Sequence, residues 1–121
     1  MKPLTFWVPW DNMCSDNRKY ISRHFVLSPQ YRSAKTAVGL LAKAAARKQK
    51  WGLQSGRLEL AVVVTEPDHR VRDLNWSKFL KDGITEAGLV WVDDSQVRIE
   101  RWESLAIDKG KAGAEVTVSV L

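Results

Sequence analysis

The sequence has 121 residues with only one cysteine and two histidines, and it lacks any long hydrophobic run. A single cysteine, Cys14, cannot form an intrachain disulfide, and His24 and His69 are too distant in the sequence to complete a recognisable zinc motif with it. The longest apolar stretches, Leu60 to Val64 and Gly88 to Val92, are much shorter than the ~20 residues of a membrane-spanning helix. A disulfide scaffold, a zinc module and a helical membrane protein are therefore excluded.

Acidic residues are missing from one long stretch, between Asn17 and Leu58. The whole chain has 19 Lys and Arg against 14 Asp and Glu, a formal net charge of +5, and most acids lie in the second half. This asymmetry favours a nucleic-acid partner, because neutralising phosphates releases counterions. A solvated basic surface or a protein partner is the alternative. The basic residues of the stretch are Arg18, Lys19, Arg23, Arg32, Lys35, Lys43, Arg47, Lys48, Lys50 and Arg57.

Repeats, low-complexity tracts and long linkers are also absent. With 45% hydrophobic and 27% charged residues, the composition is that of one globular domain, which we expect to cover residues 1–121. A multidomain enzyme is excluded by the length. Because no apolar signal core follows Met1-Lys2-Pro3, we expect a cytoplasmic protein.

The residue pattern predicts an α+β domain, a small mixed β-sheet with two helices in the order β-α-β-α-β-β. Ser28-Pro29 is typical of a helix start, and this helix should end near Lys50. A second helix is predicted from Leu74 to about Ala87, with Asp73 as N-cap and Gly88 as terminator. The predicted strands are Leu4 to Val8, Leu58 to Thr65, which is apolar enough on both faces to be central, Val97 to Ile107, and Ala114 to Leu121.

The first predicted helix is amphipathic, with a basic face opposite its apolar stripe. Such a face can contact DNA phosphates, although a solvated surface is the simpler interpretation. The apolar stripe holds Tyr31, Ala34, Val38, Leu41 and Ala45, and the basic face holds Arg32, Lys35, Lys43, Arg47 and Lys50.

Carboxylates gather at two places in the second half. Asp73 lies in a polar segment between a strand and a helix, where it can be a helix cap or a ligand. Asp93 and Asp94 are adjacent in a turn, and two such charges are costly unless they are solvated or bound to a cation such as Mg²⁺ or Mn²⁺. Lys78 can point toward the same site or pair with Asp82 four residues later.

These segments resemble the RusA-like Holliday junction resolvases, small dimeric endodeoxyribonucleases common in phages and prophages. The similarity covers roughly Thr5 to Arg101. It is carried by Pro67-Asp68-His69-Arg70-Val71-Arg72-Asp73-Leu74, by Asn75 and Lys78, by Trp91-Val92-Asp93-Asp94-Ser95-Gln96-Val97, and upstream by Val8-Pro9-Trp10, Asn17-Arg18 and Leu27-Ser28-Pro29-Gln30-Tyr31-Arg32.

The resemblance implies Mg²⁺-dependent, symmetric cleavage of four-way DNA junctions by a homodimer, in DNA recombination and repair. It implies that Asp73, Asp94 and Lys78 are catalytic, and that Asp73, Asp94, Asp93 and Asn75 surround the metal. One departure from the family is clear: its pattern reads Arg-Asp-Leu-Asp-Asn, whereas here Asn75 directly follows Leu74. Either Asn75 replaces the second acid, or that acid is deleted, which the spacing to Lys78 favours.

This chemistry is physically reasonable, because a bound divalent cation lowers the pKa of an attacking water and stabilises charge on the phosphate. A lysine at the site can neutralise the phosphate in the transition state. The alternative function is a non-catalytic basic DNA-binding module with a degraded metal site. Six tryptophans are present, most of them expected in a core or interface, with Trp10 and Trp76 as candidates for stacking on bases. Predicted DNA contacts are Arg70, Arg72, His69, Arg18, Lys19, Arg32, Lys35, Lys43 and Arg47, with solvent exposure as the alternative for the loop residue His69.

Overall fold

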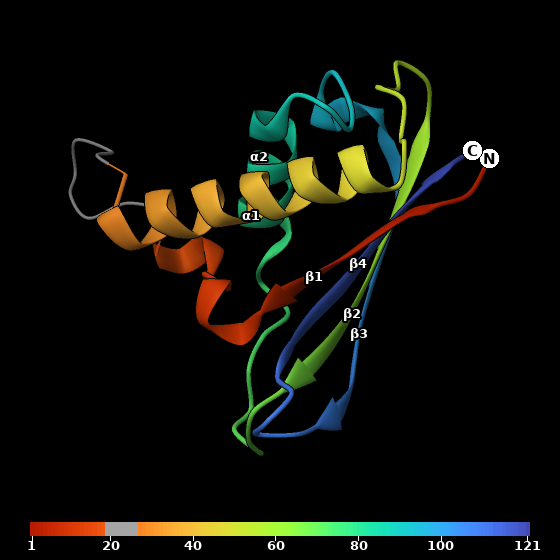
Figure 1. Ribbon diagram of the computed structural model, residues 1–121. Coiled ribbons are helices and arrows are strands. Elements are labelled where there is room, and N and C mark those ends of the chain that lie inside the picture. Colours follow the sequence, from red (N-terminus) through yellow and green to blue (C-terminus); the bar gives the residue numbers. More distant parts are fainter. Residues whose placement is uncertain (19–26) are drawn as a thin grey trace.

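The structure, a computed structural model, describes residues 1–18 and 27–121 (Figure 1). The predicted α+β class and the element order β-α-β-α-β-β are confirmed. Short 3-10 turns at Trp10–Asn12, Asp16–Arg18 and Asp94–Gln96 join the longer elements. Those elements are β1 (Leu4–Pro9), α1 (Pro29–Lys48), β2 (Leu58–Glu66), α2 (Ser77–Ala87), β3 (Val97–Ile107) and β4 (Gly113–Val120).

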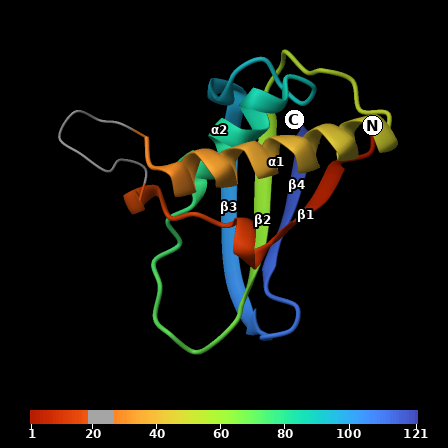
Figure 2. The same ribbon diagram turned by 60° about the vertical axis from the view of Figure 1, so that its left-hand side comes forward.

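The described strands form one mixed sheet in the order β1-β4-β2-β3. β2 is central, as its apolar pattern predicted, and it pairs with β3 in parallel and with β4 antiparallel. β3 and β4 are consecutive in the chain yet are separated in space by β2, so their turn-rich connection passes across the end of the central strand (Figure 2). The sheet therefore joins the first and last parts of the chain through the β1–β4 pair.

Both helices cover the same face of the sheet, and the core lies between them and the strands (Figures 1 and 2). α1 and α2 cross closely at Gly83, where a Cβ atom would lie only 2.8 Å from the Cβ of Val38. The opposite face is not covered by any described element, and Trp7, Val63 and Ile99 are 42%, 44% and 39% exposed on it. Within the described residues, no helix is long and apolar enough to cross a membrane.

The start of α2 differs from the prediction. This helix begins at Ser77 instead of Leu74, and Asp73 does not cap it. The cap comes from Asp16, whose carboxylate accepts hydrogen bonds from the backbone N–H groups of Lys78 at 3.0 Å and Phe79 at 2.7 Å. A partner more than sixty residues away in sequence thus satisfies the free N–H groups of the first turn. By contrast, Ser28 caps α1 as predicted, accepting from the N–H of Tyr31 at 3.0 Å.

Candidate active site

The segment 67–76 carries the first motif from the end of β2 back to the start of α2 (Figure 2). Arg72 orders this segment, because its guanidinium lies 2.9 Å from Asp68 Oδ1 and 3.3 Å from Glu66 Oε1. The N–H of Arg70, and secondarily the Arg72 guanidinium, hold the pKa of the Asp68 carboxyl below its usual range. The charge of Arg72 is therefore balanced within the chain, whereas Arg70 and His69 are exposed.

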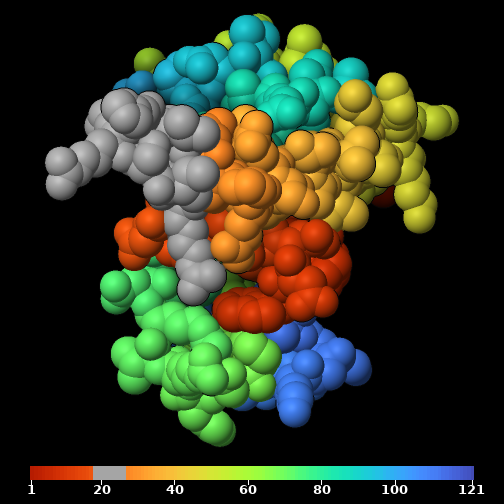
Figure 3. All heavy atoms as spheres, turned by 90° about the vertical axis from the view of Figure 1, so that its left-hand side faces the viewer, coloured from red at the N-terminus to blue at the C-terminus, as the bar shows by residue number. Residues whose placement is uncertain are grey.

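Asp73 and Asn75 lie beside a hollow of about 400 Å³ that we call the tryptophan hollow. The N–H of Asp16 donates to the backbone carbonyl of Asn75 at 2.9 Å, which ties the segment 67–76 to the N-terminal part of the chain. In Figure 3 the red-orange N-terminal segment lies next to the green segment that follows β2. Members of the lining are Trp10, Met13, Asn17, Arg72, Asp73, Asn75 and Trp76.

Lys78 lies in the first turn of α2 and contacts two carboxylates. Its Nζ is 3.2 Å from Asp82 Oδ1 and 3.9 Å from Asp94 Oδ2. The hydrogen bond to Asp82, followed by the charges of Asp94 and Asp16, raises the pKa of Lys78 above its usual value. Lys78 thus forms the predicted pair with Asp82 and also faces Asp94 of the second motif.

Asp82 is held in turn by a buried tyrosine. The hydroxyl of Tyr31, whose residue is 0% exposed, donates to Asp82 Oδ2 at 2.6 Å. Burial first, and then the hydrogen bond to Asp82, raise the pKa of Tyr31 far above its usual range, so the hydroxyl remains a donor. A chain of contacts thus runs from the core of α1 through α2 to Asp94.

The two adjacent acids of the second motif have different surroundings. Asp93 caps the short turn Asp94–Gln96 and accepts from the hydroxyl of Ser95. Hydrogen bonds from Ser95 lower the pKa of Asp93, and the charge of Lys78 adds to the effect. Asp94, with a side chain 29% exposed, is the carboxylate that faces Lys78.

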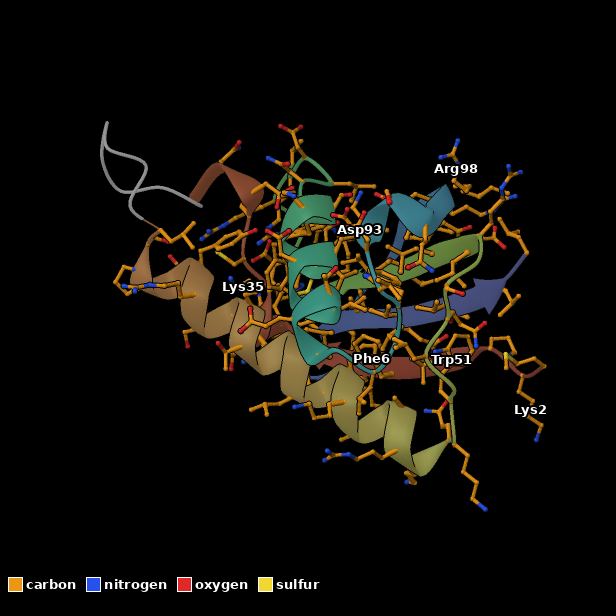
Figure 4. All side chains as sticks on the ribbon, turned by 90° about the horizontal axis from the view of Figure 1, so that it is seen from above. Lys2, Phe6, Lys35, Trp51, Asp93 and Arg98 are labelled. Carbon is orange, nitrogen blue, oxygen red and sulfur yellow. The ribbon has the colours of Figure 1, made fainter. Side chains whose placement is uncertain are left out.

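A second hollow of about 350 Å³, which we call the lysine hollow, is lined by residues of this cluster. The lining of this hollow extends from Lys35 of α1 to the second motif. Lys35 also forms an ion pair with Glu86 of α2 at 3.2 Å. In the view from above, Lys35 and Asp93 lie on either side of α2 (Figure 4). Its lining includes Lys35, Lys78, Asp82, Glu86, Asp93 and Asp94.

The predicted metal-binding residues are divided between these two hollows. Asp73 and Asn75 line the tryptophan hollow, whereas Asp93 and Asp94 line the lysine hollow. Across residues 1–18 and 27–121, no three His, Cys, Asp or Glu side chains are grouped so that they could hold a metal ion. Mg²⁺ commonly binds proteins through one or two carboxylates, with water and substrate phosphate as the other ligands. The residues present fit such a partial site around Asp94.

The predicted DNA-binding residues of α1 are distributed unevenly. Arg32 and Arg47 are exposed, and Lys43 is half-buried. Lys35 is engaged by Glu86. Two further predictions cannot be placed, because Lys19 and the side chain of Arg18 lie outside the described residues.

Sequence reasoning missed three residues of this region. Asp16 caps α2, a role that the sequence does not indicate. Tyr31 supports Asp82, whereas the sequence predicts it only as part of the apolar stripe of the first helix. Asp82 is predicted only as a partner of Lys78. The spacing of four residues between Lys78 and Asp82 was the available signal. Of the two tryptophans expected near DNA, Trp10 is partly exposed, whereas Trp76 is 5% exposed and packs against Trp102.

Carboxylates and a lysine beside a basic helix suit a protein that binds and hydrolyses phosphodiesters. The family model described as endodeoxyribonuclease RusA matches residues 9–119. The chain belongs to this family of endodeoxyribonucleases, which confirms the resemblance found in its motifs. Among curated proteins, none matches the chain.

Proposed function

We propose that this protein resolves four-way DNA junctions by metal-dependent hydrolysis, in DNA recombination and repair. The observation that carries the proposal is the position of Lys78 Nζ, 3.9 Å from Asp94 Oδ2, in a chain of the endodeoxyribonuclease RusA family. A cation and a carboxylate at this spacing suit a phosphate group and a divalent metal respectively.

The metal in the proposal is Mg²⁺, with Mn²⁺ as the alternative. When bound, it would supply an activated water and stabilise charge on the phosphate. Asp94 would hold it, with Asp93 as the oxygen donor of the same hollow. Asp73 and Asn75, the oxygen donors of the first motif, line the other hollow. Because few carboxylates converge, we expect tight metal binding only when DNA phosphates complete the site.

The protein groups have separate tasks in this proposal. Lys78 neutralises the negative charge that develops on the phosphate, and its pairing with Asp82 keeps it beside Asp94. Arg70 and His69, exposed on the segment 67–76, contact neighbouring phosphates. Arg32 and Arg47 extend the basic surface along α1.

Symmetric cleavage requires two sites, so we propose that the protein acts as a homodimer. The uncovered face of the sheet supports this proposal, because its exposed Val63 and Ile99 leave apolar area for a second copy. Light scattering on the purified protein tests it: the dimer has twice the 13.7 kDa of one chain, and Ile99→Asp should reduce the mass to one chain. A monomeric wild type at micromolar concentration would contradict it.

Substitution at Asp94 tests the catalytic role. Asp94→Asn keeps the shape of the side chain, removes its charge, and should lower cleavage of a synthetic four-way junction by about a hundredfold or more. Binding of the same junction, measured in chelator, should change little. The matched control Asp108→Asn alters an exposed acid in the β3–β4 connection and should leave cleavage unchanged.

The second candidate function is a DNA-binding module without catalysis. It is favoured by the missing acid before Asn75 and by the absence of a three-carboxylate group among residues 1–18 and 27–121. Tight, metal-independent junction binding by the wild type, without nicking in Mg²⁺ or Mn²⁺, would establish it in place of the nuclease.

A further inference from the structure

We propose that the tryptophan hollow binds one unpaired nucleobase of the DNA, next to the site of cleavage. The proposal rests on the proposed function in one respect, that the ligand of the chain is DNA. Two indoles form the apolar wall, with the ring centroids of Trp10 and Trp76 5.8 Å apart and their planes at 75°. Trp76 is 5% exposed and forms the buried floor of the hollow, whereas Trp10 is partly exposed. Aromatic surfaces of this kind stack on bases of any sequence.

The polar side of the same hollow carries amide groups. Asn17 and Asn75 line it together with the indoles. An amide side chain has both a donor and an acceptor, and the edge of a nucleobase presents both kinds of group. Enzymes that hold an extrahelical base combine these two features, a stacking surface and hydrogen bonds to the base edge.

Charge argues for a base rather than a phosphate. Among the side chains that the structure describes, the guanidinium that lines the hollow is that of Arg72. It lies 5.1 Å from the ring centroid of Trp10 and forms ion pairs with Glu66 and Asp68. The lining also includes the carboxylate of Asp73, which would repel a phosphate. A neutral, planar ligand with polar edges suits this lining, and about 400 Å³ is within the usual range for a small-ligand pocket.

The location explains what such a base site would do. Asn75 lies on the hollow three residues before Lys78, and Asp16 links the two, because its N–H donates to the Asn75 carbonyl and its carboxylate caps Lys78. A base held there lies beside the segment that leads directly into the first turn of α2, which carries Lys78. Taking a base out of the stack costs least where pairing is already interrupted, as at a branch point. The hollow would thus favour branched over continuous DNA.

Duplexes with a bulge can separate the contribution of the base to binding from that of the DNA backbone. Two duplexes are compared by fluorescence anisotropy in chelator, one with a single unpaired thymine and one with an unpaired abasic residue at the same position. Their charges are equal, so the ratio of their Kd values reports the base alone. For the wild type we expect tighter binding to the thymine bulge by about fivefold or more, the lower end of a base–aromatic stacking contribution.

Variants locate this preference in the hollow. Trp10→Ala should bring the ratio close to one, whereas Trp10→Phe, which keeps an aromatic face, should retain most of it. Asn17→Ala changes an exposed position and should lower the ratio by a smaller factor. It replaces Trp10→Ala as the test if that variant does not fold. The control Leu53→Ala removes an exposed apolar side chain between α1 and β2, outside both the hollow and the uncovered face of the sheet, and should leave the ratio unchanged.

The proposal is overturned if the wild-type ratio is near one, or if a folded Trp10→Ala retains the full ratio. These outcomes are distinct from failure of the proposed function. A protein that cuts junctions but ignores the bulged base disproves the base site alone, whereas a protein that prefers the thymine bulge but never nicks DNA supports the base site and contradicts the nuclease.

Discussion

Removing the hydroxyl of Tyr31 tests the support beneath the Lys78–Asp94 pair. Tyr31→Phe leaves the ring in place, so no cavity forms, and it deletes the 2.6 Å hydrogen bond to Asp82. The donor is fully buried and the side chain of Asp82 is only 21% exposed, so water replaces the bond poorly. A hydrogen bond to a charged group contributes about 1.5–3 kcal/mol, and we expect the free energy of unfolding to fall by about 2 kcal/mol.

Urea unfolding at neutral pH measures this loss, with Ser33→Ala, an exposed hydroxyl on the same helix, as the control expected to stay within about 0.5 kcal/mol. The pKa of Tyr31 is raised in the folded state, so its contribution is complete below the unfolded pKa of about 10 and is lost as the pH rises above it. The gap between wild type and Tyr31→Phe should therefore narrow by up to about 1.4 kcal/mol per pH unit above pH ~10. Equal stability of the two proteins at neutral pH would refute the reasoning.

Two further predictions concern the helix cap and the basic face. Asp16→Ala should lower the free energy of unfolding by about 1–2 kcal/mol, because two backbone N–H groups of α2 lose their acceptor, whereas Asp73→Ala should change it little. If urea unfolding showed a larger loss of stability for Asp73→Ala than for Asp16→Ala, Asp73 and not Asp16 would be the cap of α2. Arg47→Ala should reduce the slope of log K against log salt for duplex DNA by about 0.9, the loss of one phosphate contact. Arg98→Ala, on β3, removes the same charge as a control, and equal slopes for both variants would argue against α1 as the DNA-binding face.

The periodic parts of the fold were accessible from the sequence, because their signals are local. The serine and proline at the start of α1 predicted its first residue, and the apolar β2 predicted a central strand. The strand order was not accessible, since nothing in β3 or β4 indicates that β2 lies between them. The start of α2 was misplaced for the same reason: Asp73 is a good local cap, but the cap in the structure, Asp16, is distant in sequence.

The candidate site shows a similar division. The motif residues Asp94 and Lys78 were found from the sequence and lie near one another. Their support by Asp82 and Tyr31 depends on the crossing of α1 and α2, which the sequence does not specify. The separation of Asp73 from Asp94 into two hollows likewise depends on the path of the segment 67–76.

The activity proposed for this chain is cleavage of branched DNA with a divalent metal. The most direct measurement incubates the wild-type protein with a labelled four-way junction, and with a linear duplex of the same sequence, in Mg²⁺ and in chelator. We expect paired nicks at symmetric positions in the junction, only in Mg²⁺, with the linear duplex left intact. A junction that stays intact in both Mg²⁺ and Mn²⁺, across a range of salt and pH, would contradict it.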